Sequence, residues 1–433
     1  MNESTKRTVT IFTIAFSLLP CLLILHFPAT ATVSSVALWA SAAIGYMGIV
    51  LLLWMYILGT KGVMSYIYSD LAPVLSIHKW LGKYGSIAVF LHPILITISY
   101  GETWLYSIIP KVGTVAERHI LLGQIALCLL ALTWGISFFM RKKLAYRPWK
   151  YTHYLAYICV PFALLHVPDL GSQEQTYLVV KGYLFILALV YFIFVLLRLR
   201  SWMNLDKTTY TVLRHVQLTD VDFMMRLIPT SGHLITPKRG QYVYLKLGLL
   251  SEDHPFSVTQ YDQKTGYITL AYRLAGMFTK ELRKLSEGNH VSVSGPFGSF
   301  MEDLSSTDTT PVVYLAGGIG ITPFVERIMN ESDSREQWLF AAHRTRELAV
   351  LYEPLKSKLG NRAVAVFNSD DSDLGPHEER GYITADIIKK YIDDPTRYRY
   401  YLCGPPLMMD AMRAMVTSLG VAPEQVKYEK FGW

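Results

Sequence analysis

Four histidines inside two apolar segments constrain this chain more than any other feature. His78 and His92 lie fourteen positions apart in one segment, and His153 and His166 lie thirteen apart in a later one. Fourteen helical residues rise about 21 Å and end within about 40° of the starting face. The pattern predicts two helices that clamp two stacked haems, with one histidine from each helix on each iron.

For any single histidine, the alternative is a hydrogen bond to a neighbouring membrane helix. An imidazole in the hydrocarbon layer is costly, however, and four of them in this arrangement favour ligation over packing. The thirteen-residue spacing is a difficulty, because an ideal helix places His153 and His166 on different faces. Pro161 lies between them and can kink the helix.

Hydrophobic residues make up 51% of the 433 residues, and they are concentrated in residues 1–200. Each apolar run there is close to the ~20 residues that a helix needs to cross a bilayer. We expect an integral membrane domain over residues 1–202 with six spans, at residues 9–27, 34–58, 76–99, 119–140, 148–168 and 177–199. The first span lacks a small-residue cleavage site, so it is expected to remain as an anchor.

Lysine and arginine gather before the first span, between the second and third, between the fourth and fifth, and at the end of the sixth. The positive-inside rule then places both termini in the cytoplasm, with the chain in the plasma membrane. Spans three and five both run outward. His78 and His153 would lie on the cytoplasmic side, and His92 and His166 on the outer side.

The remaining composition excludes several classes of protein. The net charge of +7 is too dispersed to indicate a nucleic-acid partner, although part of it suits anionic cofactors. None of the four cysteines pairs into a pattern that indicates a disulfide framework or a zinc site.

The second half reads as a soluble α/β protein. Short β-branched and aromatic runs predict an antiparallel barrel over residues 205–307, with one helix near Met277–Leu285; the expected strands are Tyr210–Leu213, Phe223–Leu227, Tyr242–Leu247, Tyr267–Tyr272 and His290–Ser294. Strands and helices then alternate over residues 308–433, which predicts a parallel nucleotide-binding sheet with strands at Pro311–Leu315, Gln337–Ala341, Ala363–Val366 and Tyr398–Cys403. The polar stretch Asn368–Glu379 is expected to be an exposed loop.

Two motifs in this sheet indicate a dinucleotide site. A strand runs into Gly317, Gly318 and Gly320, and then into Thr322-Pro323 at a helix start, where a pyrophosphate can approach the backbone. The run Cys403-Gly404-Pro405-Pro406 ends another strand, where ligands bind in such sheets. Cys403 is a candidate to border a nicotinamide ring, or alternatively a buried small residue before a rigid turn.

Two further runs suit a flavin. An aromatic-flanked hydroxyl can contact an isoalloxazine ring, and a basic residue with a helix start can hold a pyrophosphate. These residues can equally be ordinary strand and turn residues. The runs are His254-Pro255-Phe256-Ser257 and Arg273 with Gly276, Met277, Phe278 and Thr279.

Over nearly its full length the chain resembles the NADPH oxidase and ferric reductase superfamily. The resemblance rests on the histidine pairs, the two flavin runs, Gly295-Pro296-Phe297-Gly298, the glycine loop and the Cys403 run. It implies that the two flavin runs bind FAD, that the glycine loop and Cys403-Gly404-Pro405 bind NAD(P)H, and that the histidines ligate two b-type haems. A terminal aromatic residue covers the flavin in such proteins, so Trp433 is the candidate here, with Phe431 second.

The resemblance also implies an activity. A nicotinamide gives two electrons as hydride and a haem iron accepts one, so a flavin must lie between them. We expect electrons to pass from NADPH to oxygen outside the cell, giving superoxide, without an obligatory protein activator. Arg118 and His119 either assist at the acceptor, pair with haem propionates or anchor the helix. The other acceptors are ferric iron and an extracytoplasmic protein partner.

Coenzyme preference is less constrained. Arg344 and Arg346 follow the strand that ends near Ala342, and they either reach the 2′-phosphate of NADPH or are solvated cations at a helix start. The sequence favours NADPH, with NADH accepted.

Overall fold

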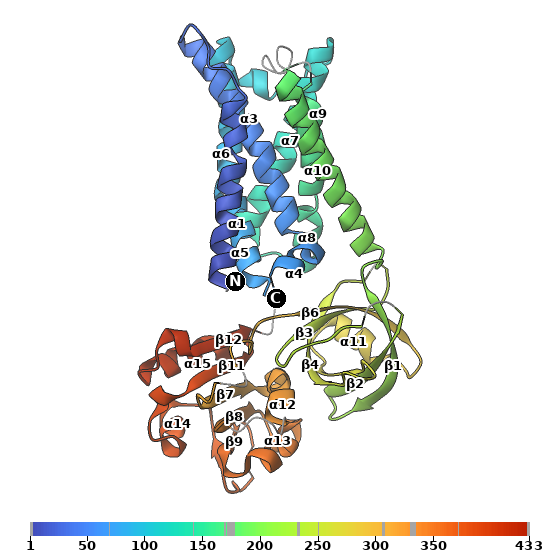
Figure 1. Cartoon of the computed structure of the whole chain (residues 1–433), viewed down its shortest axis with the longest axis vertical. Helices are drawn as coiled ribbons and strands as arrows, with labels where there is room; N and C mark the ends of the chain where they lie inside the picture. The colour runs from blue at the N-terminus through green and yellow to red at the C-terminus, as the bar shows by residue number, and fades with distance from the viewer. Residues whose placement is uncertain are drawn as a thin grey trace. The chain divides into compact units, whose positions relative to one another are not determined.

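A computed structural model of the chain divides into two compact units, Met1–Arg200 and Ser201–Trp433. The structure describes residues 3–68, 70–141, 143–168, 170, 178–231, 234–249, 251–304, 308–329, 335–370 and 372–430. Helices build the first unit, and the second contains an antiparallel barrel and a parallel sheet flanked by helices (Figure 1).

The helices between residues 3 and 202 pack around a core of buried apolar side chains. They are α1 (Glu3–Ser17), α2 (Leu19–Leu23), α3 (Val33–Leu58), α4 (Lys61–Ile67), α5 (Ala72–Trp80), the π-helical η1 (Leu81–Gly85), α6 (Ser86–Tyr100), the 3₁₀ turn η2 (Trp104–Ser107), α7 (Val115–Gly135), the π-helical η3 (Ile136–Met140), α8 (Tyr146–His153), α9 (Ala156–His166) and α10 (Leu178–Trp202).

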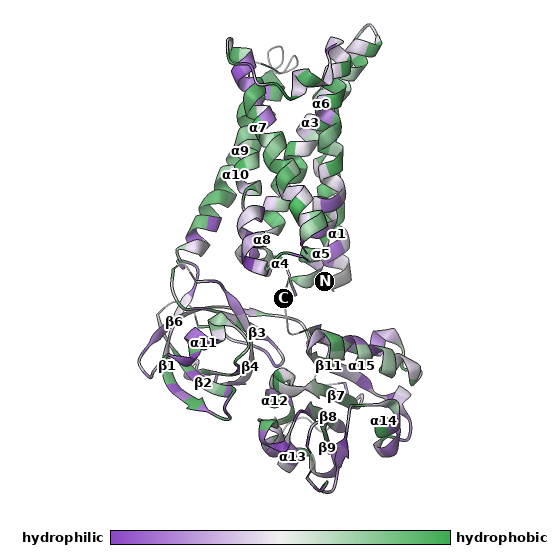
Figure 2. Ribbon diagram, turned by 180° about the vertical axis from the view of Figure 1, so that it is seen from behind, coloured by the Kyte–Doolittle hydropathy of each residue, from purple (hydrophilic) through white to green (hydrophobic). Residues whose placement is uncertain are grey.

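Five helical segments in the described residues are long and apolar enough to cross a membrane: Thr5–Leu23, Val33–Leu58, Ala72–Tyr100, Val115–Met140 and Leu178–Trp202. Large apolar side chains remain exposed on them, as on α1 and α10, and much of the helical unit is coloured as hydrophobic (Figure 2). Such a surface suits lipid rather than water.

The span expected over residues 148–168 is not one regular helix. It forms α8 and α9, and Tyr154 and Leu155 separate them. The amides of Tyr157 and Ile158 bond three residues back, to the carbonyls of Tyr154 and Leu155. These bonds are of the 3₁₀ type and tighten the helix at this point.

The second unit begins with a closed six-stranded barrel in the order β1-β2-β5-β4-β3-β6, paired antiparallel. Alternate side chains of each strand fill its interior. The elements are β1 (Thr208–Gln217), β2 (Asp222–Ser231), β3 (Tyr242–Lys246), β4 (His254–Tyr261), β5 (Ile268–Arg273), α11 (Met277–Arg283) and β6 (His290–Phe297). Strand β4 was not among the expected strands, although it carries one flavin run.

A six-stranded parallel sheet follows, in the order β10-β9-β8-β7-β11-β12. Its strands are β7 (Val312–Gly317), β8 (Gln337–His343), β9 (Ala363–Phe367), β10 (Glu378–Arg380), β11 (Arg399–Gly404) and β12 (Val426–Lys430). Its helices and turns are η4 (Gly318–Ile321), α12 (Thr322–Met329), η5 (Arg346–Leu348), α13 (Tyr352–Leu359), η6 (Gly360–Arg362), α14 (Ala385–Tyr391), η7 (Pro395–Arg397), α15 (Pro406–Ser418) and η8 (Pro423–Gln425). An apolar core lies on each face. The barrel and the sheet confirm the predicted reductase-like fold.

The expected loop at Asn368–Glu379 needs correction. Its last two residues belong to the edge strand β10, where Glu378 pairs with Ala365 and Glu379 with Val366 of β9. Strand β12, on the opposite edge, was also missed, because its alternating Lys427 and Glu429 disguise a parallel edge strand.

Candidate electron-transfer sites

The four membrane histidines meet in two pairs. The ring centroids of His78, on α5, and His153, at the end of α8, are 6.0 Å apart. Those of His92, on α6, and His166, at the end of α9, are 6.2 Å apart. The pairing matches the two-level arrangement that the spacing suggested.

These distances fit two imidazoles on opposite sides of one metal. A first-row metal lies about 2 Å from an imidazole nitrogen, which lies about 1 Å from its ring centroid, so opposite ligands have centroids about 6 Å apart. Within the described residues there is no cluster of three or more histidine, cysteine, aspartate or glutamate side chains that could bind an ion by itself. A haem, which needs only two protein ligands, suits the pairs better.

Each of the four rings is oriented through Nδ1. His78 donates to the Met55 carbonyl at 3.1 Å, His92 to the Ser41 carbonyl at 2.9 Å and His166 to the His119 carbonyl at 2.8 Å. The Nδ1 of His153 lies 3.1 Å from the Ser137 hydroxyl. Ligand histidines characteristically use one nitrogen in this way, and the other then faces the metal. The Nε2 atoms are thus the candidate iron ligands.

Neighbouring glycines allow two of the rings to approach a second helix. A methyl group on Gly123 of α7 would lie 2.5 Å from the Nδ1 of His166, and one on Gly45 of α3 would lie 3.1 Å from the Nδ1 of His92. His153 has a different neighbour, because its ring stacks on Trp149 with centroids 5.1 Å apart.

Neither histidine-bearing span is an ideal helix. The angle between the two histidines of a span therefore cannot be calculated from ideal helix geometry. The π-helical residues Leu81–Gly85 lie between His78 and His92, and a π turn rotates less per residue. The tight turn at Tyr154 and Leu155 follows His153 and rotates more per residue. The π turn lowers the rotation between His78 and His92 about the helix axis, and the tight turn raises the rotation between His153 and His166. The two spacings, fourteen and thirteen residues, differ by one.

Arg118 and His119 lie at the start of α7. The Arg118 side chain is exposed, and its Nε donates to the Thr114 carbonyl at 3.4 Å. The His119 Nδ1 bonds the Pro168 carbonyl, while the His119 carbonyl accepts from His166. His119 therefore connects to the His92–His166 pair through its backbone.

The barrel brings the two flavin runs together. The ring of His254 on β4 stacks on that of Phe278 on α11, with centroids 4.0 Å apart, and Phe256 lies 5.9 Å from Phe278. Ser257 is buried, and its hydroxyl has no hydrogen-bond partner among the described residues. A buried hydroxyl beside aromatic rings fits a flavin that supplies the missing bond.

Arg273 is held by a buried carboxylate. Its Nε and Nη2 donate to the two carboxylate oxygens of Asp222 at 2.7 and 2.8 Å, across the β2–β5 pair. Its remaining nitrogen faces the glycine loop, since a methyl group on Gly318 would lie 3.2 Å from Nη1. The Thr279 hydroxyl accepts from the amides of Ala275 and Gly276 and so closes the turn before α11.

The two nucleotide motifs lie backbone against backbone. Strands β7 and β11 are neighbours, and a methyl group on Gly320 would lie 2.4 Å from the Cys403 carbonyl oxygen. Gly404 approaches Gly317 in the same way. The Thr322 hydroxyl donates to the Ile319 carbonyl at the start of α12, with Pro323 in its first turn, and Pro405 precedes α15. Glycine is therefore required at position 320 because of this close approach.

Cys403 is fully buried, and burial raises the pKa of its thiol well above the usual range. The thiol is therefore neutral at pH 7. Nearby, His343 at the end of β8 is buried too, and desolvation lowers its pKa to about 4. Neither group carries a charge at neutral pH.

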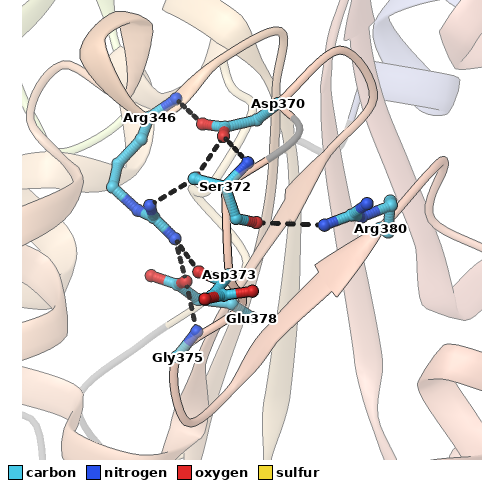
Figure 3. Close-up of polar contacts among 7 residues, drawn as sticks. All are labelled: Arg346, Asp370, Ser372, Asp373, Gly375, Glu378 and Arg380. Atoms are coloured by element: carbon cyan, nitrogen blue, oxygen red, sulfur yellow. Dashed lines mark hydrogen bonds and ion pairs between the residues drawn. The ribbon is translucent and has the colours of Figure 1, made fainter.

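Arg344 and Arg346 are both exposed after β8, and Arg346 is held by polar partners from the stretch that leads into β10 (Figure 3). Phe431 and Trp433, the candidates for the flavin cover, lie outside the described residues.

Sequence reasoning missed the groups that orient the ligands. Ser41, Ser137 and Asp222 each fix a predicted site residue by a hydrogen bond. Gly123 had a visible signal, because an isolated glycine inside an apolar helix often has a packing reason. The serines had none, since their partners are distant in sequence.

The chain matches two families of known proteins. Residues 44–164 match the ferric reductase like transmembrane component, and residues 314–414 match the oxidoreductase NAD-binding domain. The first match covers His78, His92 and His153 and ends two residues before His166, and the second covers the glycine loop and the Cys403 run.

Curated relatives match about half of the chain. One is the electron transfer subunit of a dihydroorotate dehydrogenase B (NAD(+)) from Fusobacterium nucleatum, 27% identical over 48% of this chain and 79% of that protein. Another is a flavohemoprotein from Bacillus cereus, 27% identical over 52% of this chain. The chain spans 61% of the length of that flavohemoprotein.

Solved structures are similar at lower identity. The cytochrome b5 reductase domain of Ulva prolifera nitrate reductase is 18% identical, with a TM-score of 0.46 over 52% of this chain and 97% of its own. A flavohemoglobin from Malassezia yamatoensis with bound FAD and heme is 20% identical, with a TM-score of 0.47 over 93% of this chain and 99% of its own.

Proposed function

This chain has the architecture of the NADPH oxidase and ferric reductase superfamily, and from that premise we propose that it is a superoxide-producing transmembrane oxidase. Electrons would pass from cytosolic NAD(P)H through FAD and two b-type haems to oxygen outside the cell. The observation that carries the proposal is the meeting of four histidines from separate helices in two pairs, each with Nδ1 occupied by another group.

The residues of each unit have distinct tasks in this scheme. His78 with His153, and His92 with His166, would hold the irons through Nε2. In the barrel, the hydroxyl of Ser257 and the guanidinium of Arg273 would hold the flavin, and Asp222 would orient Arg273. A bound flavin supplies the conversion from a two-electron donor to one-electron acceptors.

The nucleotide sheet would present the nicotinamide to the flavin. The glycine loop before α12 suits a pyrophosphate, because its backbone can be approached closely and a helix begins there. Cys403 and Gly404 end the neighbouring strand at the same edge. The neutral, buried Cys403 thiol would border the ring without competing for hydride.

We favour oxygen as the acceptor. Each histidine pair would supply two protein ligands to its haem iron, so electrons would pass to the acceptor by outer-sphere transfer. Arg118 is exposed at the start of α7 next to His119, whose carbonyl orients His166. We assign the electrostatic stabilisation of superoxide to Arg118, with the side chain of His119 beside it.

Ferric iron is the second candidate acceptor, because the matched transmembrane family is described as ferric reductase like. An extracytoplasmic protein partner is the third. The proposed topology has six spans in the plasma membrane, with α8 and α9 together as the fifth and both termini in the cytoplasm.

The test uses the full chain purified in detergent and loaded with FAD and haem. We expect a bis-imidazole b-type absorption spectrum, oxygen consumption on adding NADH or NADPH, and cytochrome c reduction that superoxide dismutase suppresses. The Arg118→Ala variant should retain both haems but form superoxide more slowly. Cytochrome c reduction that is insensitive to the dismutase, together with rapid reduction of ferric chelates, would instead identify a ferric reductase.

A further inference from the structure

The end of strand β8 is the position where a parallel nucleotide-binding sheet distinguishes NADH from NADPH. The glycine loop follows β7, and β8 is its neighbour in the sheet. In such sheets a carboxylate near the end of the second strand accepts from the ribose 2′-hydroxyl of NADH, whereas an arginine there holds the 2′-phosphate of NADPH. Arg344 and Arg346, one and three residues after β8, are the arginines at this position, and Arg346 is the one paired with the carboxylate of Glu378.

Both terminal nitrogens of Arg346 donate to partners from the stretch after β9 (Figure 3). Its Nη2 forms an ion pair with the carboxylate of Glu378 and also donates to the Asp373 carbonyl at 3.2 Å. Its Nη1 donates to the Ser372 hydroxyl at 2.7 Å. Its backbone amide donates to the Asp370 carboxylate at 2.8 Å. The guanidinium therefore faces protein acceptors in an arrangement that a phosphate would have to displace.

The two carboxylates are themselves fixed. Glu378 belongs to β10, accepts from the Gly375 amide at 2.8 Å, and has a side chain only 9% exposed. Asp370 accepts from the Ser372 hydroxyl and amide. These bonds, with that from the Arg346 amide, lower the pKa of Asp370 to about 2. Burial opposes ionisation of Glu378, but Gly375 and Arg346 still hold its pKa below the usual range. Both carboxylates are ionised at neutral pH.

From these contacts we infer that Glu378 and Asp370 form a carboxylate clamp on Arg346 that makes the chain prefer NADH to NADPH. A 2′-phosphate group carries about 1.5 to 2 negative charges near neutral pH, and it would meet two carboxylates and an occupied arginine. The ribose hydroxyl of NADH meets no such repulsion. This inference rests on the proposed dehydrogenase half-reaction, and it reverses the preference for NADPH that Arg344 and Arg346 suggested in the sequence.

The adjacent Glu379 provides a matched control. Successive residues of a strand face opposite sides, and Glu379 bonds Lys390 and the Tyr391 hydroxyl, both at 2.6 Å, instead of Arg346. Glu378→Gln and Glu379→Gln therefore remove the same charge one residue apart, and only the first releases Arg346.

The experiment measures kcat/KM of the full chain for NADH and NADPH, with ferricyanide taking electrons from the flavin so that the haems are bypassed. We expect the wild type to favour NADH by about tenfold or more, and Glu378→Gln to raise kcat/KM for NADPH about tenfold. Glu379→Gln should change the ratio less than about twofold. Adding Arg346→Ala to Glu378→Gln should abolish the gain, because the released arginine is what binds the phosphate.

Equal or better use of NADPH by the wild type would overturn the inference, and so would an equal gain in Glu379→Gln. No reduction of ferricyanide with either nucleotide would overturn the proposed function as well, so the two failures are distinguishable. A comparison on the wild type needs no variant: 2′,5′-ADP should inhibit NADH oxidation more weakly than AMP, and stronger inhibition by 2′,5′-ADP would contradict the clamp.

Discussion

The two histidine pairs have similar centroid separations, yet different parts of the chain hold them. Both rings of the His92–His166 pair donate to main-chain carbonyls, and a glycine of a second helix lies against each ring. In the other pair, His78 donates to a carbonyl, but His153 depends on the Ser137 hydroxyl and on stacking with Trp149.

The difference teaches that equal ligand geometry does not require equal support. A carbonyl belongs to the backbone and cannot be removed by substitution, whereas a hydroxyl can. A ring pressed against glycine tolerates no added methyl group, whereas a ring stacked on an indole has an adaptable neighbour. The two proposed haem sites should therefore respond differently to the same kind of mutation.

The largest effect should come from removing the ligands of one pair. His92→Ala combined with His166→Ala should remove one of two haems and reduce transfer to an outside acceptor to below about 1%. Haem content by pyridine haemochromogen, redox difference spectra and superoxide formation measure this. Ferricyanide reduction by the flavin should persist, which controls for misfolding. Retention of both pigments would contradict the assignment of these ligands.

A methyl group at Gly123 should have the next largest effect. Gly123→Ala places Cβ 2.5 Å from the His166 Nδ1, so the ring must leave its bond to the His119 carbonyl. We expect about a tenfold or greater loss of affinity for one haem. Gly135→Ala on the same helix is the control, because nothing lies within 4 Å of its Cβ. Haem titration of the apoprotein compares the two, and equal behaviour would exclude a steric role for Gly123.

Ser137→Ala should weaken the other pair. It removes the side-chain partner of His153 while leaving the ring in place, and loss of such a partner typically costs about 10- to 100-fold in metal affinity. We expect a value near the lower end, because Trp149 still stacks on the ring. The measurement is haem affinity together with the midpoint potential of each haem, and an unchanged affinity would show that the stacking alone suffices.

Ser41→Ala should have the smallest effect, although Ser41 contacts His92 as Ser137 contacts His153. The Ser41 hydroxyl lies 2.9 Å from the His92 Nδ1, but the Ser41 carbonyl accepts from the same nitrogen and survives the substitution. We expect haem affinity within about threefold of the wild type. An effect as large as that of Ser137→Ala would remove the distinction between backbone-held and side-chain-held rings.

Much of the nucleotide site could be predicted from the sequence, because its motifs consist of residues that are adjacent in the chain. Glycines between a strand and a helix are contiguous in sequence, and so is the Cys403-Gly404-Pro405 run. The reason for Gly320 is not local, since the atom it avoids is the carbonyl of Cys403 on a neighbouring strand. The same holds for the partners of Arg346, which come from 24 to 32 residues further along the chain.

The sequence by itself determined the apolar spans, the order of barrel and sheet, and the identity of the four paired histidines, because these depend on residue type and spacing along one segment. Only the tertiary structure decided how those histidines meet despite the thirteen-residue spacing of His153 and His166, through a π turn in one span and a tight turn in the other. It also decided that Arg346 is occupied by Glu378. The direction in which a helical side chain points, and the partner that it meets, depend on how distant segments pack. A small local change in helical twist cannot be predicted from residue type, and it rotates every residue that follows in the helix.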